Sequence, residues 1–72
     1  MPARAIPEAD RLWLVGERAF QDGLAALSRQ SLERLIERHP SDARVPDATL
    51  LLGRACMATG DLPAALDAFQ RS

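Results

Sequence analysis

Residues 47–69 read DATLLLGRACMATGDLPAALDAF, and the dipeptide Gly60-Asp61 divides this stretch into two apolar runs with helical spacing. Glycine commonly closes a helix because it accepts a positive φ, and aspartate is a favoured N-cap for the helix that follows. Pro63 falls in the first turn of the second run, where its missing N–H costs nothing. The stretch therefore predicts two short helices joined by a tight turn.

The chain has few means of stabilising itself beyond its own apolar core. With 72 residues it is one small domain, and such a chain rarely keeps more than about 3–5 kcal/mol of stability without cross-links or metals. Cys56 is the only cysteine and His39 the only histidine, so the sequence predicts no internal disulfide, no metal site and no cofactor. Association with another copy, or with further repeats of a longer protein, would supply more contacts.

Composition argues against several classes of partner. The chain is 47% hydrophobic and 26% charged with a net charge of −1, which is typical of a folded domain. Because no basic run is present, we expect neither nucleic-acid binding nor electrostatic attraction to a membrane. No stretch approaches the roughly 18 apolar residues of a spanning helix, so no membrane insertion is expected. No signal peptide is recognisable, which leaves both cytoplasm and periplasm open.

Apolar periodicity and stop signals predict four helices and no strand. The expected ranges are 8–22, 24–38, 42 or 47 to 59, and 62 to the last residues, after a loose leader over residues 1–8. Gly23 ends the first helix, and His39-Pro40 ends the second because a residue before proline is pushed out of the α region. The start of the third helix stays open between Asp42 and Asp47. The apolar face expected for the first helix is Leu12, Val15, Ala19 and Phe20.

The first half of the chain aligns with the second half at a constant offset of 37 residues. The aligned pairs are Leu12 with Thr49, Val15-Gly16 with Leu52-Gly53, Ala19 with Cys56, Gly23 with Gly60, Ser28 with Ala65, and Leu32 with Phe69. A period of 20–50 residues with two helices per unit indicates an α-solenoid. The small residues are expected where two helices approach closely, and Leu32 and Phe69 are expected to fill the space between hairpins.

These residues resemble the tetratricopeptide repeat. The first copy has Leu12, Val15-Gly16, Ala19, Gly23, Ser28, Leu32, Leu35 and Pro40, and the second has Thr49, Leu52-Gly53, Cys56, Gly60, Ala65, Phe69 and Ser72. The resemblance implies an all-α chain of two antiparallel helix hairpins in a short solenoid, with repeats over residues 9–42 and 43–72. The period exceeds the usual 34 residues, and the longer loop with HPSD and PDA is similar to the bacterial cell-envelope members, such as the coordinator proteins of outer-membrane and Tol–Pal assembly.

In this family the first helix of each repeat lines a concave groove. Carried over by position, the groove residues are Asp10, Trp13, Leu14, Glu17, Phe20, Gln21, Asp47, Leu50, Leu51, Arg54, Met57 and Ala58. The resemblance thus implies a scaffold module that binds a protein or peptide segment on an apolar helix face. The competing interpretation is that these side chains are core residues covered by a neighbouring repeat or a second chain.

Two other functions stay open. One is self-association, in which a homodimer completes the solenoid, with or without exchange of hairpins across Ser41–Pro46. Its contact residues would be Leu62, Leu66 and Phe69 of the fourth helix. The other is a non-catalytic fragment of a larger enzyme. No catalytic residue is expected in this chain, because no group orients its carboxylates as an acid–base pair and no second cysteine or histidine lies at useful spacing from Cys56.

Overall fold

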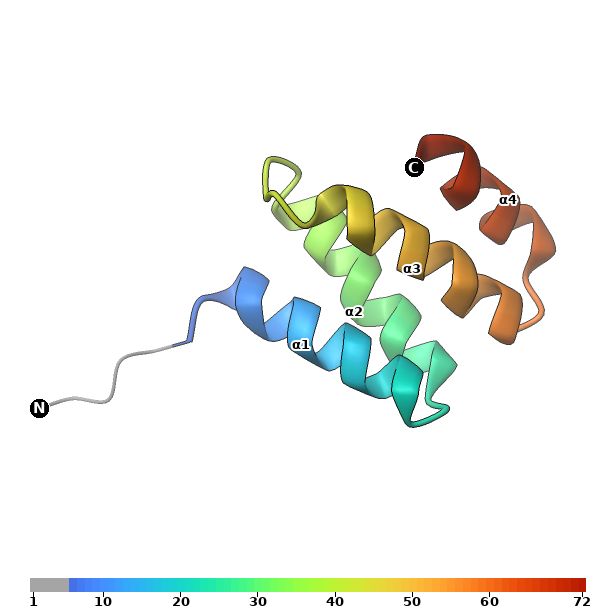
Figure 1. The fold of residues 1–72 in the computed structure, drawn as a ribbon, viewed down its shortest axis with the longest axis horizontal. Coiled ribbons are helices and arrows are strands. Elements are labelled where there is room, and N and C mark those ends of the chain that lie inside the picture. The colour runs from blue at the N-terminus through green and yellow to red at the C-terminus, as the bar shows by residue number, and fades with distance from the viewer. Residues whose placement is uncertain (1–5) are drawn as a thin grey trace, which may run out of the picture.

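The computed structural model describes residues 6–72, and these residues form four helices that pack consecutively (Figure 1). The helices are α1 (Glu8–Gln21), α2 (Ala25–Arg38), α3 (Val45–Ala58) and α4 (Leu62–Arg71). Each helix runs in the opposite direction to the one before it (Figure 1). Residues 6–72 contain no strand, and none of their helices has the length and apolar character needed to cross a membrane. The predicted all-α class is confirmed.

The helix bounds agree with the expected ranges, and the third helix begins between its two alternatives. The side chain of Asp42 accepts a hydrogen bond from the backbone N–H of Arg44 at 2.8 Å. This contact holds a turn in front of the helix, so α3 starts at Val45, with Pro46 in its first turn. The expected leader falls largely on residues 1–5, which lie outside the described residues, and Glu8 is already helical.

The two tight turns have the same backbone hydrogen bonds, one repeat apart. Gly23 and Gly60 have φ values of 78° and 82°, so both occupy the left-handed region that a side chain would strain. The N–H of Leu24 reaches the carbonyl of Ala19, and the N–H of Asp61 reaches that of Cys56, at 2.8 and 2.9 Å. The predicted glycine turns are confirmed. Asp61 also caps α4 as predicted, by accepting from the N–H of Ala64 at 3.1 Å.

Within each hairpin a glycine of the first helix is in direct contact with a large side chain of the second helix. A Cβ added at Gly16 would lie 2.7 Å from Cδ2 of Leu32, and one added at Gly53 would lie 2.5 Å from Cε1 of Phe69. The hydroxyl of Ser28 donates a buried hydrogen bond to the Gly16 carbonyl at 2.7 Å. The two glycine contacts are 37 residues apart, as the sequence alignment requires.

The core is a continuous band that follows the four helices in order. Leu32 and Leu35 of α2 are fully buried and lie at its centre. The other buried members are Leu12 of α1, Ala48, Leu52 and Cys56 of α3, and Ala65 and Ala68 of α4. The inner helices α2 and α3 are packed on both sides, whereas α1 and α4 each have one neighbour along the chain.

A cluster of ion pairs fastens the start of α1 to the α2–α3 connection. The carboxylate of Glu8 lies 2.9 Å from Nη1 of Arg38 and 2.8 Å from Nε2 of His39. Arg44 lies 2.8 Å from Asp10 and 2.9 Å from Asp42. The hydrogen bond with His39 lowers the pKa of Glu8, and the hydrogen bonds from Arg44 hold the pKa of Asp42 well below its ordinary value.

We expect Gly16→Ala to destabilise the chain although alanine is the better helix former by about 1 kcal/mol. The new methyl group would press on Leu32, which is fully buried. Overpacking of this kind costs about 1–3 kcal/mol, so the net free energy of unfolding should fall. Urea denaturation would measure it. Gly53→Ala is the matched variant and should cost less, because Phe69 is partly exposed on the terminal helix. Equal or increased stability of Gly16→Ala would contradict the close approach.

Acid should weaken the fold through Glu8 and Asp42. Because their pKa values are lowered in the folded chain, their contribution to stability is complete above the unfolded values, about 4, and is lost as pH falls through the folded values. The urea midpoint should therefore be flat between about pH 7 and 5 and should fall below about pH 4. In Glu8→Gln the acid loss should be smaller than in the wild type. An identical acid profile for the two proteins would count against the Glu8 cluster.

Candidate functional site

A shallow groove runs between α1 and α3, the first helices of the two hairpins. Its hollow measures about 280 Å³ and is lined by Trp13, Glu17, Asp47, Leu50, Leu51 and Arg54. Trp13 and Leu51 also pack against the edge of the core, and their side chains form the apolar floor of the groove. Leu50 and Arg54 are exposed on the groove wall.

Half of the twelve side chains predicted for the groove line this hollow: Trp13, Glu17, Asp47, Leu50, Leu51 and Arg54. The other six do not line it. Asp10 is paired with Arg44, and Gln21 and Ala58 are exposed at the ends of α1 and α3. Phe20 is half-buried near the end of α1, Met57 is exposed near the end of α3, and Leu14 lines a different hollow.

The charged side chains of the groove have no ionic partner within the described chain. Most charged residues among 6–72 form ion pairs, as in the Glu8 and Arg44 clusters. The exceptions within that range are Arg34 and Glu37 on α2, and Glu17, Asp47 and Arg54 in the groove. Two carboxylates and one guanidinium therefore stand beside an apolar floor, free to bind complementary charges.

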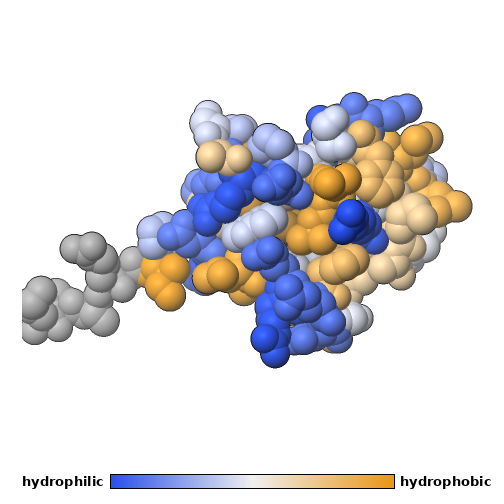
Figure 2. Space-filling model, viewed as in Figure 1, coloured by the Kyte–Doolittle hydropathy of each residue, from blue (hydrophilic) through white to orange (hydrophobic). Residues whose placement is uncertain are grey.

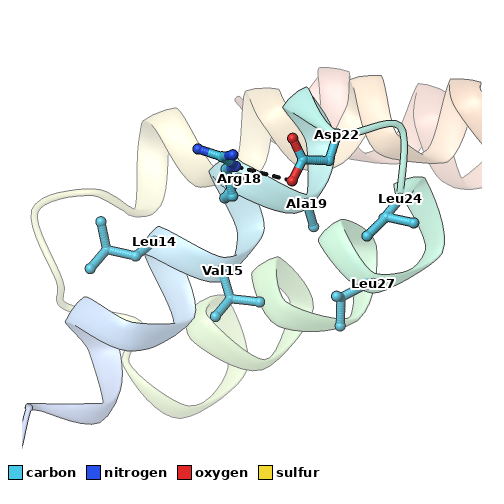
Figure 3. Close-up of a pocket in the computed structure, with 7 residues that line it drawn as sticks. All are labelled: Leu14, Val15, Arg18, Ala19, Asp22, Leu24 and Leu27. Carbon is cyan, nitrogen blue, oxygen red and sulfur yellow. Dashed lines mark hydrogen bonds and ion pairs between the residues drawn. The ribbon is translucent and has the colours of Figure 1, made fainter.

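A second hollow lies on the outer side of the α1–α2 hairpin, and we name its lining the α1–α2 end surface. It measures about 340 Å³ and consists of Leu14, Val15, Arg18, Ala19, Asp22, Leu24 and Leu27. Figure 3 shows the apolar side chains of both helices around this hollow, with Arg18 paired to Asp22 beside it at 3.0 Å. Leu14 and Leu24 are 59% and 53% exposed.

This surface was not expected from the sequence. Val15 was predicted on the buried face of α1 together with Leu12 and Ala19, whereas it is 36% exposed in the structure and lines the end surface. The position was ambiguous because helical spacing gives the direction of a side chain but does not say which neighbour covers it. The repeat alignment contains the signal. Val15 aligns with Leu52, which the preceding helix α2 covers, and within the described residues no helix precedes α1 to cover Val15.

The outer face of α4, which we name the α4 end surface, is also apolar. It carries the three residues predicted for self-association, and Leu62 and Leu66 are about three-fifths exposed while Phe69 is partly exposed against Gly53. In the view of Figure 2, apolar side chains gather on the side of the molecule that holds α4 and the end of α3. The described chain therefore has an apolar surface at each end.

Cys56 and His39, the side chains with reactive groups, both make contacts that belong to the fold. Cys56 is buried in the core, and this burial raises the pKa of its thiol. His39 ends α2 and is bound to Glu8. Within residues 6–72, no three or more His, Cys, Asp or Glu side chains are grouped in a way that could hold a metal ion.

The buried thiol should react slowly. In the native chain we expect Cys56 to react with a thiol reagent such as DTNB at least about tenfold more slowly than in urea, because the reagent must wait for local opening. The colour change at pH 8 measures both rates. A native rate equal to that of the unfolded chain would show that Cys56 is accessible.

Comparisons with known proteins identify no relative of this chain. No protein-family model matches it, and no significant match is found among curated proteins or solved structures. The resemblance to the tetratricopeptide repeat therefore depends on the residue pattern and the 37-residue period.

Proposed function

We propose that this chain is a protein-binding module built from two hairpins of the tetratricopeptide type, with no catalytic role. Support comes from contacts that recur with the sequence period. Gly16 faces Leu32 and Gly53 faces Phe69, and the turns at Gly23 and Gly60 have the same hydrogen bonds. Two hairpins that repeat a packing contact in this way are the unit from which helical repeat arrays are built.

We propose the groove between α1 and α3 as the binding site. The observation that carries this assignment is the set of three charged side chains, Glu17, Asp47 and Arg54, which line an apolar floor and form no ion pair with described residues. Charged groups that are held beside a hydrophobic surface without internal partners give orientation and specificity to a bound segment.

The composition of the groove indicates the chemistry of its ligand. Trp13, Leu50 and Leu51 offer an apolar floor to two or three aliphatic or aromatic anchors, as in helix-in-groove recognition. Glu17 and Asp47 favour a basic side chain in the ligand, and Arg54 favours a carboxylate. The best fit is a short protein segment with apolar anchors and one charge of each sign.

The test is selection of peptides from a random display library against the 72-residue chain, followed by titration of the selected peptides. Trp13 is the only tryptophan and tyrosine is absent, so fluorescence reports binding at the groove directly. Arg54→Ala should weaken selected peptides that carry a carboxylate by about tenfold, the loss of one charge-assisted hydrogen bond. Arg34→Ala is the matched control, because Arg34 is equally unpaired but lies on α2.

Trp13→Ala should weaken the same peptides by about 30-fold, or about 2 kcal/mol, if Trp13 is an anchor. It is measured by calorimetry, since the variant has no fluorophore, and urea denaturation checks that it is folded. Peptides that bind equally to the wild type, Trp13→Ala and Arg54→Ala would place their site elsewhere. Failure to select any peptide would also count against the proposal.

A further inference from the structure

We infer that copies of this chain stack end to end, with α4 of one copy packed against the α1–α2 end surface of the next copy. The inference depends on the 37-residue repeat and on the α2–α3 junction, which is the structure's own example of one hairpin packed on another. It is independent of the groove and of any ligand.

The end surface on α1 corresponds to the surface of α3 that is buried against α2. Moved by 37 residues, Leu14, Val15, Arg18 and Ala19 coincide with Leu51, Leu52, Ala55 and Cys56. Leu52 and Cys56 belong to the buried cluster with Leu32 and Leu35 of α2, and Ala55 is fully buried. Val15 and Arg18, which are exposed in the single chain, thus have the positions of Leu52 and Ala55, which are buried. Leu14 has the position of Leu51, which is partly buried.

The α4 end surface corresponds in the same way to the face of α2 that α3 covers. Leu62, Leu66 and Phe69 coincide with Ala25, Arg29 and Leu32. Leu32 packs against Gly16 on one side and is covered by α3 on the other, so it is fully buried. Phe69 makes the equivalent contact with Gly53 but is still 36% exposed. To bury Phe69 fully, a further helix would have to lie against α4 as α3 lies against α2. In the stack, α1 of a second copy takes that position.

Two positions that are charged at the α2–α3 junction are both apolar at the two ends of the chain. This paired change indicates that the partner of each end surface is a second copy of the chain. At the α2–α3 junction, Arg29 forms an ion pair with Asp61 at 2.9 Å. The counterpart of Arg29 is Leu66, and the counterpart of Asp61 is Leu24. An ion pair inside the chain is therefore replaced by two exposed leucines, one on each end, which would meet in the stack.

The surrounding positions support the same match. Arg29 also pairs with Glu33 at 3.4 Å, and the counterpart of Glu33 is the neutral Gln70. Two cations take the places of buried residues: Arg11 aligns with Ala48, and Arg18, which is paired with Asp22, aligns with Ala55. Because Ala48 lies in the first turns of α3, next to the end of α2, Arg11 would face the C-terminal end of α4. A cation is favoured there by the helix dipole.

The geometry favours stacking over exchange of hairpins. The connection that would have to open for exchange, residues 39–44, is held to α1 by His39–Glu8 and Arg44–Asp10. Stacking leaves these contacts intact. Because the two ends differ, each contact is head to tail and leaves one free end on each side, so the assembly is open and grows with concentration.

The experiment uses two variants that block one end each, Leu24→Asp and Leu66→Asp. Both leucines are more than half exposed, so the variants should fold, which circular dichroism checks. Sedimentation velocity over a dilution series should show a wild-type mass that rises with concentration beyond a dimer. Each variant alone should associate at least about tenfold more weakly, because a carboxylate is placed in an apolar contact.

Mixing the two variants gives the decisive result. Only one junction, between the intact Leu66 end and the intact Leu24 end, remains possible, so a 1:1 mixture should form a dimer and nothing larger. A wild type that stays monomeric at millimolar concentration, a wild-type assembly that closes at two copies, or a variant that dimerises alone would each overturn head-to-tail stacking.

A rescue variant tests the correspondence with the internal junction. Leu24→Asp combined with Leu66→Arg in one chain recreates the charges of Arg29 and Asp61, so assembly should return and should weaken with salt, unlike that of the wild type. Leu50→Asp, a groove variant, should assemble like the wild type while losing peptide binding. This control separates failure of stacking from failure of the proposed groove, and loss of assembly in Leu50→Asp would overturn the assignment of the ends.

Discussion

The close approach at the two glycines sets the geometry on which the other features depend. At Gly16 and Gly53 there is no room for a Cβ, so Leu32 and Phe69 rest directly on the backbone of the neighbouring helix. The buried hydrogen bond from Ser28 to the Gly16 carbonyl fixes the first contact further. With each hairpin closed in this way, α1 and α3 present their outer faces side by side, and the groove is the space between them.

Consecutive packing explains why a chain with so small a core exposes so many leucines. A helix in the interior of the series has neighbours on both sides, and Leu32 and Leu35 of α2 are accordingly inaccessible. A helix at either end has the same kind of apolar stripe but only one neighbour along the chain. Leu14 and Leu66 are therefore exposed because of where their helices lie in the series, and their sequence context resembles that of buried residues.

Local signals in the sequence were sufficient to predict the helices and turns, but they did not predict contacts between residues far apart in the chain. The Gly60-Asp61 turn, its cap and the 37-residue period were readable because each depends on residues close in sequence or on self-alignment. The start of α3 was an exception among the local features: the contact in front of it, between Asp42 and Arg44, joins residues two positions apart, but both Asp42 and Asp47 stood where a helix could begin. The exposure of Val15 and the Glu8–His39 contact also depend on which distant element lies alongside. Six of the twelve predicted groove residues did converge, because the family resemblance from which they were carried over contains three-dimensional information that periodicity lacks.

The groove and the ends would be linked if copies stack. In the stack, α1 of the next copy lies beside α3 as α3 lies beside α1 within one chain, so each junction creates a further groove. By the same 37-residue correspondence, Leu14 would take the place of Leu51 there, and Glu17 would take that of Arg54. Leu14, which lines the end surface in the single chain, would then join a continuous apolar floor. A ligand long enough to cross a junction would bind two copies at once, and its binding free energy would stabilise the assembly by mass action.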